Sequence, residues 1–517
     1  SESKDEALAF FAAALLLLPE DERDFHLRRC IASENVSSLR HLTASVTPLL
    51  LVVNSDEKLG VSSAPNNGHH VVIPLGKADA THTQTVSIPR PQRSDLETEM
   101  AKSGLSRDTA AELATLGRRS LLALRRKLAS VPDIKCPVWA APNEARAILP
   151  FLLAGKWVDT NQPDQEILAK LAGTSYEHLN QVLSRWANEP DAPIRRVGNT
   201  WFLVSKEDGR SLIAKFLTRE DLDNFERVFL EILNTVDPAV DLDPDTRCQA
   251  NILGKVMPYS NYLREGMAET LAIMAARSQM TQWLDAHTGQ ERADSIIWKL
   301  LDAANKDWRL WPSFAYQLQL FAEASPERFL EALDTGLRGD DPPVMRLFSK
   351  GSGVSLGGSS YHPSLLWALE LLAWNPDYLS QSSLLLAKLS RLDPGGNLGK
   401  RPPATLRGIF LGWYNQTNAT LDKRLLAIDV LRRHEPDASW NLMVALLPEM
   451  HGIGHPSAKP RWREWNITSE PSVTCADIWK LTESIVDRML EDVGVSAEKW
   501  SSLLYALGRV PKPQHES

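Results

Sequence analysis

The sequence predicts a mostly α-helical protein of several domains: a partial α/β unit, a winged-helix-like unit, and then an α-solenoid of HEAT- or TPR-like helical repeats. Three observations favour this fold class. The chain has 517 residues, of which 43% are hydrophobic, so it is too long for one core and apolar enough for several. Patterns typical of strands end before residue 205. Helical periodicity then continues from residue 218 nearly to the end.

Residues 1–90 alternate helix-like and strand-like patterns and predict the partial α/β unit. The apolar run at 7–18 predicts a buried helix that stops at Pro19, because it is shorter than the roughly 18 residues of a membrane span. The continuous apolar run at 49–53 predicts a strand buried on both faces, as in a parallel sheet. A further strand is expected from His69, with His69 and His70 as edge residues. Because the chain begins inside this unit, we interpret it as a fragment or a processed product.

The segment 91–140 is predicted to be a small helical lid. Apolar spacing indicates helices over 95–128, broken around Gly104 and Gly117. A basic run lies on these helices, and we interpret it as a solvated face rather than a phosphate contact. The run consists of Arg118, Arg119, Arg125, Arg126 and Lys127.

Residues 141–217 show the order of a winged helix. Helix-like segments at 144–157, 163–172 and 176–186 are followed by β-prone runs on either side of Gly198-Asn199, a dipeptide typical of tight hairpins. The third helix is polar rather than basic, and Arg195 and Arg196 are the only basic cluster nearby. We therefore favour a structural winged helix that packs on neighbouring domains over one that binds DNA.

Residues 218–517 are predicted to form the helical-repeat domain. Thr218 is expected to cap its first helix. Pro326, Pro376 and Pro436 are each followed by an acid and apolar residues, which predicts a helix that begins at each proline. Their uneven spacing argues against a tetratricopeptide array and fits degenerate helix pairs of the HEAT type. The tryptophans from Trp298 to Trp500 are expected mostly to fill gaps between helices.

Composition and motifs argue against several classes of function. A net charge of −8 argues against nucleic acid as the main partner. The four widely spaced cysteines form no CxxC pair, which favours reduced thiols, a cytoplasmic location and no zinc site. His434, His451 and His455 lack the spacing of a metal site. The GxSxG pattern around Ser355 lies in a Gly/Ser-rich stretch, so a loop is favoured over a hydrolase nucleophile.

One weak signal suggests nucleotide sensing. The apolar run at 49–53 ends in Asn54, and nucleotide-binding sheets present a polar group to the γ-phosphate or its water in this way. Any strand that ends in a turn looks similar. The chain contains no GxxxxGK[ST] phosphate loop, and Gly76-Lys77 lacks the glycine-rich lead and the hydroxyl.

The order of units and several phrases resemble the C-terminal parts of bacterial STAND-type NTPases, the NLR-like signalling proteins associated with phage defence. The phrases lie at 47–51, 68–74, 121–128, 263–271 and 372–376. The resemblance implies that residues 1–90 are the tail of a P-loop core, with Asn54 at a position like the sensor residue. It also implies that ATP and Mg²⁺ are bound only if an upstream P-loop core exists, so this chain alone is not expected to hydrolyse ATP.

The leading hypothesis is a signalling, sensor or scaffold module that binds a protein ligand through residues 218–517 and needs no cofactor, metal or membrane of its own. One alternative is a winged-helix DNA-binding regulator that uses Arg195 and Arg196 and carries a helical effector arm. Another is an enzyme, either an ATPase half or a hydrolase that uses Ser355. The identity of the ligand, the effector activity and oligomerisation stay open at this point.

Overall fold

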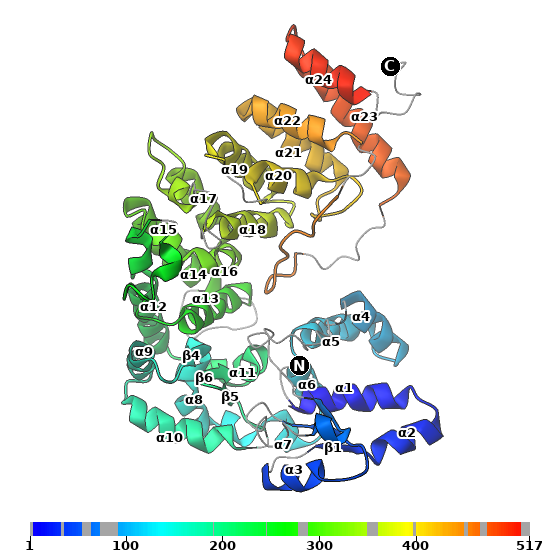
Figure 1. The fold of residues 1–517 in the computed structure, drawn as a ribbon, viewed down its shortest axis with the longest axis vertical. Helices are drawn as coiled ribbons and strands as arrows, with labels where there is room; N and C mark the ends of the chain where they lie inside the picture. The colour runs from blue at the N-terminus through cyan, green and yellow to red at the C-terminus, as the bar shows by residue number, and fades with distance from the viewer. Residues whose placement is uncertain are drawn as a thin grey trace. The chain divides into compact units, whose positions relative to one another are not determined.

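The structure is a computed structural model that describes residues 4–32, 36–53, 64–72, 91, 93–189, 191–243, 246–277, 288–348, 360–395, 400–448, 453–465 and 473–507. These residues form 24 α-helices and two three-stranded sheets, so the fold is mostly α-helical and multidomain, as predicted. None of the described helices is long and apolar enough to cross a membrane. The chain divides into two compact units, Ser1–Leu217 and Thr218–Ser517 (Figure 1).

The first unit begins with a small parallel sheet. The strands β1 (Cys30–Ala32), β2 (Leu50–Val52) and β3 (His70–Val72) lie in this order, and Leu50 is paired with both Cys30 and His70. The parallel arrangement confirms the prediction made from the apolar run at 49–53. Asn54 lies outside the described residues. The accompanying helices are α1 (Lys4–Leu16), α2 (Glu20–Leu27) and α3 (Val36–Thr43).

One expectation for this segment was wrong. The first helix is not buried, because Phe10 and Leu16 of α1 keep 46% and 69% of their surface exposed. Among the described elements, α1 packs beside α2 and β2. The expected strand β3 is an edge strand of the sheet, and His69, which precedes it, is buried with only 3% of its surface exposed. Its Nδ1 accepts a hydrogen bond from the backbone N–H of Leu49 at 3.1 Å, so it ties β3 to the start of β2.

The next helices are α4 (Arg93–Lys102), α5 (Arg107–Arg119), α6 (Leu121–Leu128) and α7 (Pro132–Lys135). The predicted break at Gly104 is present, with a left-handed φ of +94°. The predicted break at Gly117 was wrong, because Gly117 lies inside α5. The helix instead ends before Ser120, whose side chain caps α6. Gly117 allows α5 to pack closely against α6, because a Cβ at this position would lie only 2.9 Å from Cδ2 of Leu124.

The end of the first unit combines four helices with an antiparallel sheet. Along the chain it contains α8 (Pro142–Ala154), β4 (Lys156–Val158), α9 (Gln162–Ala172), α10 (Tyr176–Ala187), β5 (Ile194–Val197), β6 (Thr200–Leu203) and α11 (Lys206–Ile213). The sheet order is β4-β6-β5, and the predicted hairpin turns at Gly198 with a φ of +59°. The expectation that Trp157 ends the first of these helices was wrong. Gly155, with a φ of +75°, stops α8, and Trp157 pairs with Trp201 in the sheet.

The second unit, the arm, consists of helices without a sheet in its described part (Figure 1). Its helices are α12 (Arg219–Leu233), α13 (Asn261–Ala276), α14 (Gly289–Lys306), α15 (Leu310–Ser313), α16 (Leu318–Ala324), α17 (Pro326–Gly336), α18 (His362–Ala373), α19 (Leu379–Leu392), α20 (Pro402–Phe410), α21 (Leu421–His434), α22 (Pro436–Leu446), α23 (Cys475–Asp492) and α24 (Ala497–Leu507). Successive contacts join α13, α16, α18 and α20, which we call the inner row. A second row runs through α12, α14, α17, α19 and α21.

The ends of these helices follow the local sequence in most places. Thr218 and Asp221 form a reciprocal capping box at the start of α12, as expected of Thr218. Pro326 and Pro436 begin α17 and α22. The prediction for Pro376 was wrong, because α19 begins only at Leu379. The side chain of Asn375 accepts a hydrogen bond from the backbone N–H of Asp377 at 3.0 Å, which stabilises a turn there instead of a helix.

The tryptophans of the arm fill inter-helix gaps only in part. Those at 311, 374, 440 and 462 are buried, as expected. Others keep between 39% and 52% of their surface exposed, namely Trp298, Trp367, Trp413, Trp479 and Trp500.

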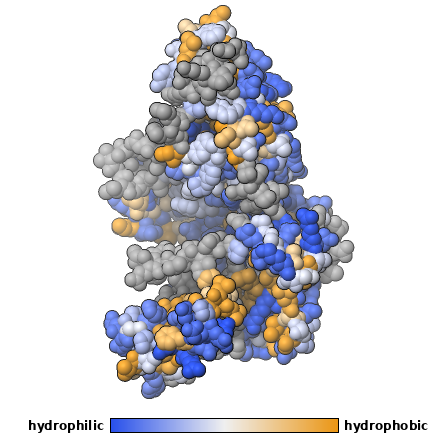
Figure 2. All heavy atoms as spheres, turned by 90° about the vertical axis from the view of Figure 1, so that its right-hand side faces the viewer, coloured by the Kyte–Doolittle hydropathy of each residue, from blue (hydrophilic) through white to orange (hydrophobic). Residues whose placement is uncertain are grey.

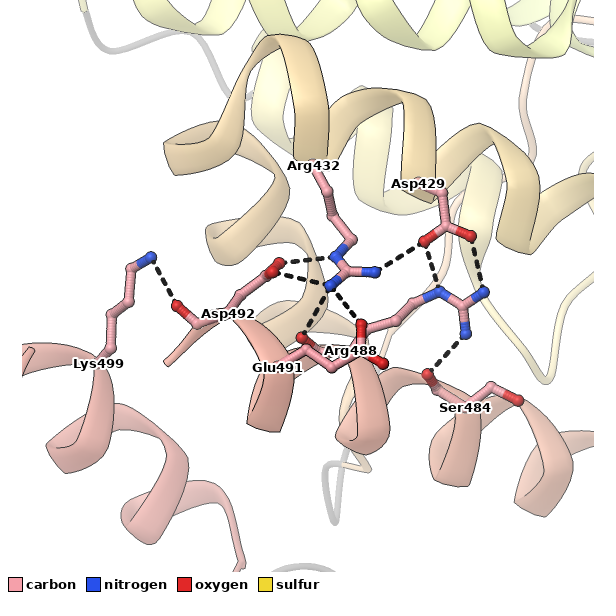
Figure 3. A network of polar contacts seen from close by, with 7 residues as sticks. All are labelled: Asp429, Arg432, Ser484, Arg488, Glu491, Asp492 and Lys499. Carbon is pink, nitrogen blue, oxygen red and sulfur yellow. Dashed lines mark hydrogen bonds and ion pairs between the residues drawn. The ribbon is translucent and has the colours of Figure 1, made fainter. Parts of the chain in front are cut away.

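An ion-pair network closes the far end of the arm (Figure 3). Asp429 and Arg432 of α21 face Arg488, Glu491 and Asp492 of α23. Arg488 binds both carboxylate oxygens of Asp429 at 2.8 Å. Arg432 binds Asp492 through Nε and Nη2, both at 2.7 Å. These bidentate contacts fix α23 against α21.

Beyond this network, the last helix leaves apolar surface exposed. It packs against α22. Figure 2 shows hydrophobic side chains among hydrophilic ones at this end, the top of the view. The large exposed apolar residues of α23, α24 and the turn between them are Trp479, Leu490, Val495, Trp500, Leu504 and Tyr505.

Candidate functional site

An extended segment of the chain lies against the inner row of the arm. Residues 453–465, which we call the strap, adopt neither helix nor strand (the orange loop in Figure 1). Hydrogen bonds and ion pairs connect the strap to four inner-row helices, α20, α18, α16 and α13. The strap is therefore a peptide-like segment that the arm holds along its length.

The centre of the strap is bound by one buried carboxylate. Glu323 of α16 is only 1% exposed. Its Oε1 accepts the backbone N–H of Arg461 at 2.8 Å, and its Oε2 accepts those of Trp462 at 2.6 Å and Arg463 at 3.1 Å. Burial raises the pKa of the Glu323 carboxyl, while the three N–H groups act in the opposite direction by favouring the carboxylate. The main chain of the strap thus supplies the hydrogen bonds that this buried acid requires.

A second buried glutamate binds the preceding part of the strap. Glu370 of α18 is 4% exposed, and its Oε2 accepts the backbone N–H of Ala458 at 3.0 Å. Its Oε1 is paired with Nζ of Lys400 at 2.5 Å. The indole of Trp374 donates to the carbonyl of Ala458 at 2.9 Å. Ala458 is therefore held through both its backbone donor and its backbone acceptor.

A third buried glutamate binds a side chain of the strap. Glu269 of α13 is 2% exposed and pairs with Nη1 of Arg461 at 2.5 Å. The next arginine, Arg463, donates from Nε to the carbonyl of Glu323 at 2.6 Å and from Nη2 to that of Ala324 at 3.1 Å. Burial lowers the pKa of Arg463. The cationic side chains of this part of the strap are therefore bound by a carboxylate and by backbone carbonyls of the inner row.

The beginning of the strap is bound in the same manner. Oε1 of Gln416 accepts the backbone N–H of Ser457 at 2.9 Å, and its Nε2 donates to the carbonyl of His455 at 2.8 Å. Gly454 passes so close to the arm that a Cβ would lie 2.8 Å from the ring of Trp413. Backbone groups again make most of the contacts.

These contacts define a candidate site for an extended polypeptide. Glu269, Glu323 and Glu370 lie on successive helices of the inner row and are nearly inaccessible to solvent. Sequence reasoning missed them, since an isolated glutamate in a helix normally belongs to the solvated face. Their repeat-like spacing of roughly 50 residues was the only available signal. Within the described ranges, no group of acidic, histidine and cysteine residues could hold a metal ion.

The predicted nucleic-acid residues occupy the hairpin of the first unit. Arg196 pairs with Asp159 at 2.9 Å and donates from Nε to the carbonyl of Gly198 at 3.0 Å. Arg195 is half-buried and has interactions of its own. On the helix before the hairpin, Arg185 pairs with Glu144 at 2.9 Å. The positive charges of Arg185 and Arg196 are thus already balanced by carboxylates of the same unit.

The interpretation of the basic run as a solvated face was wrong for Arg126. Its guanidinium, 5% exposed, binds both carboxylate oxygens of Asp208 at 2.7 and 2.8 Å and both of Asp191 at 2.7 and 2.8 Å. Nη1 also donates to the carbonyl of Ile134 at 2.9 Å, and the group lies over the ring of Trp139. Burial raises the pKa of Asp208 to about 6. Arg126 therefore joins α6 to α11 and is not accessible to a phosphate.

The serine and histidines that the sequence suggested as catalytic or metal-binding candidates do not form a site among the described residues. Ser355 and His451 lie outside the described residues. His434 ends α21, and His455 is an exposed residue of the strap whose carbonyl binds Gln416.

Comparisons with known proteins assign neither a family nor a function to the chain. No family model matches the chain, and neither the search of curated proteins nor the search of solved structures finds a match. The candidate site therefore rests on the geometry of the inner row and the strap.

Proposed function

We propose that the chain is a signalling, sensor or scaffold module of a larger STAND-like NTPase and that its arm, residues 218–517, binds a protein ligand. The observation that carries the proposal is the strap, because an arm that holds thirteen consecutive residues of its own chain, in neither helix nor strand, has the chemistry to hold a polypeptide. Solenoid arms characteristically present such elongated surfaces to partners. A cytoplasmic role in defence against phage belongs to the same proposal.

The first unit supports the proposal through its topology. A parallel sheet is followed by helices α4 to α7 and then by three helices with an antiparallel sheet of order β4-β6-β5. This is the order expected for the tail of a P-loop core, a lid and a winged-helix-like unit. In this proposal ATP and Mg²⁺ are bound only if the protein also has a P-loop core outside this chain, and the chain itself relays ligand binding at the arm to that core.

The alternative of a DNA-binding winged helix is weaker. The ion pair between Arg196 and Asp159 and the pair between Arg185 and Glu144 reduce the positive charge that the third helix and the hairpin could offer to phosphates.

The experiment is a display screen with the purified full chain as bait, followed by hydrogen exchange of the complex with any partner obtained. We expect a protein partner whose binding protects amides within residues 218–517. Protection confined to residues 1–217 would contradict the proposal. So would salt-dependent binding of duplex DNA that disappears in the Arg195→Ala/Arg196→Ala variant, or binding of ATP by this chain alone.

A further inference from the structure

We propose that the strap is an internal ligand that can be displaced: Glu269, Glu323 and Glu370 form a binding site for an extended, basic, proline-containing segment of a protein partner, and the strap competes with that segment. The inference rests on the proposed function, because it names the surface and the kind of partner segment that the arm recognises. Four observations lead to it.

The first observation is that the arm recognises mainly the backbone of the strap. Glu323 accepts three backbone N–H groups, and Glu370 and Gln416 accept one each. Trp374 and Gln416 donate to two backbone carbonyls. Every residue except proline offers the same N–H and C=O groups. An extended segment from another protein could therefore make these contacts without sharing the sequence of the strap.

The second observation concerns the side chains that are recognised. Lys459, Arg461 and Arg463 occupy alternate positions of the strap, and each of them contacts the inner row through its cationic group. Nζ of Lys459 lies 4.8 Å from the ring centroid of Trp374. Arg461 pairs with Glu269, and Arg463 is bound by carbonyls of α16. This pattern favours a partner segment with basic residues at alternate positions.

The third observation is the pair of prolines, Pro456 and Pro460, in the strap. Proline fixes φ in the range of extended and polyproline conformations and lacks an N–H that would need an acceptor. A segment with prolines loses less conformational entropy when it is held straight. The site is therefore suited to segments that are already extended before they bind.

The fourth observation is the burial of the glutamates. Glu323 is shielded from solvent while the strap is in place, and the three N–H groups of the strap replace the hydration that the carboxylate loses. Because this burial depends on the strap, its departure would leave a carboxylate that water can solvate rather than an unpaired buried charge. A segment of another protein that offers the same N–H groups could therefore take the place of the strap.

The test measures exchange directly. The probe is a synthetic, fluorescently labelled peptide with the sequence of residues 453–465, and the chain is used at full length. In the Arg461→Ala/Arg463→Ala variant the internal strap loses its ion pair with Glu269 and the side-chain hydrogen bonds of Arg463 to α16, while its backbone contacts to Glu323 and the inner row itself are unchanged. We expect the peptide to bind this variant at least about tenfold more tightly than the wild type, measured by fluorescence anisotropy.

The controls identify the site. Adding Glu323→Ala to the strap variant should abolish binding of the peptide. Adding Glu327→Ala, which changes an exposed glutamate on the neighbouring helix α17, should leave binding unchanged. A peptide with alanine in place of its three basic residues should bind at least about tenfold more weakly. Equal affinity of wild type and strap variant, or binding that survives Glu323→Ala, would overturn the proposal.

A second measurement covers a strap variant that fails to fold. Hydrogen exchange of the wild-type strap is followed by mass spectrometry while the unlabelled peptide is added to saturation. The amides of residues 461–463 should exchange faster as the peptide replaces the strap at Glu323, and unchanged exchange would contradict displacement. The same readout separates this inference from the proposed function, because a protein partner that binds the arm without altering strap exchange supports only the proposed function.

Discussion

At the scale of single residues, the buried charged side chains of Arg126 and Glu323 form hydrogen bonds with specific partners. Arg126 is bound by two aspartates and a backbone carbonyl, and Glu323 is bound by three consecutive backbone N–H groups. Both residues look like ordinary surface positions in the sequence. Apart from the carbonyl of Ile134, which is eight residues from Arg126, their partners are separated from them by tens of residues or more, so the pairing depends on the fold and has no local signature.

Asp208 leads to a prediction about pH. Burial raises its pKa to about 6 in the folded state, above the ordinary value for aspartate. The folded state therefore binds more protons than the unfolded state between about pH 4 and pH 6, and this group contributes more stability below that interval than above it. A shift of this size corresponds to on the order of 3 kcal/mol. The unfolding midpoint of the wild type relative to Asp208→Asn should accordingly fall as the pH rises from 4 to 6, measured by calorimetry.

The control for this measurement is Asp133→Asn, which changes an exposed aspartate on α7. Its midpoint relative to the wild type should stay nearly constant over the same interval. A difference between wild type and Asp208→Asn that does not vary with pH would contradict the assignment.

At the scale of elements, close packing decides where glycine is required. Gly336 is the last residue of α17, and a Cβ there would lie 2.4 Å from Oδ1 of Asn305 and 2.6 Å from Cγ2 of Val344. Asn305 cannot move freely, because it donates to the carbonyl of Ala332 and accepts from the indole of Trp311. Gly336→Ala should lower the free energy of unfolding by about 1–3 kcal/mol, measured by chemical denaturation.

Gly408 provides the matched control within the same arm. It lies inside α20, and a Cβ there would have no heavy atom within 4 Å. Gly408→Ala should therefore be neutral or stabilise the protein by up to about 1 kcal/mol, because alanine loses less conformational entropy in a helix. Equal destabilisation by both substitutions would show that packing at Gly336 is not the cause.

The network at the end of the arm predicts a local effect on α23. Hydrogen bonds from Arg488 hold the pKa of Asp429 below its usual range, so its contribution is present at neutral pH and is lost as the pH falls through that lowered value. Asp429→Asn should weaken the contact between α21 and α23 (Figure 3). Hydrogen exchange of residues 475–492 should become several-fold faster at pH 7.

Asp422→Asn tests the specificity of that effect, since Asp422 is an exposed residue in the first turn of the same helix. It should leave exchange in α23 unchanged. Faster exchange throughout the arm in Asp429→Asn would instead indicate a general loss of stability.

At the scale of the whole molecule, the chain contains two compact units, each with a buried apolar core of its own. We expect calorimetry to resolve two unfolding transitions. Asp208→Asn should shift only the transition of Ser1–Leu217, and Gly336→Ala only that of Thr218–Ser517. A single cooperative transition that both substitutions shift equally would contradict this expectation.

The sequence by itself determined the mostly helical fold class, the parallel strand at 49–53, the hairpin around Gly198 and the cap at Thr218. These features depend on periodicity, turn residues and capping, which act between neighbours along the chain. The same local reasoning failed at Gly117, which lies inside α5, and at Pro376, where a turn held by Asn375 precedes the helix.

Only the tertiary structure revealed the candidate site. Glu323 meets residues 461–463 across nearly 140 positions of sequence, and Glu269 meets Arg461 across a still longer interval. No local pattern marks a helical glutamate as buried, because its burial depends on a segment that arrives from elsewhere in the chain. The stacking of α13, α16 and α18 brings three such glutamates into one row, and the strap supplies the donors that make their burial tolerable.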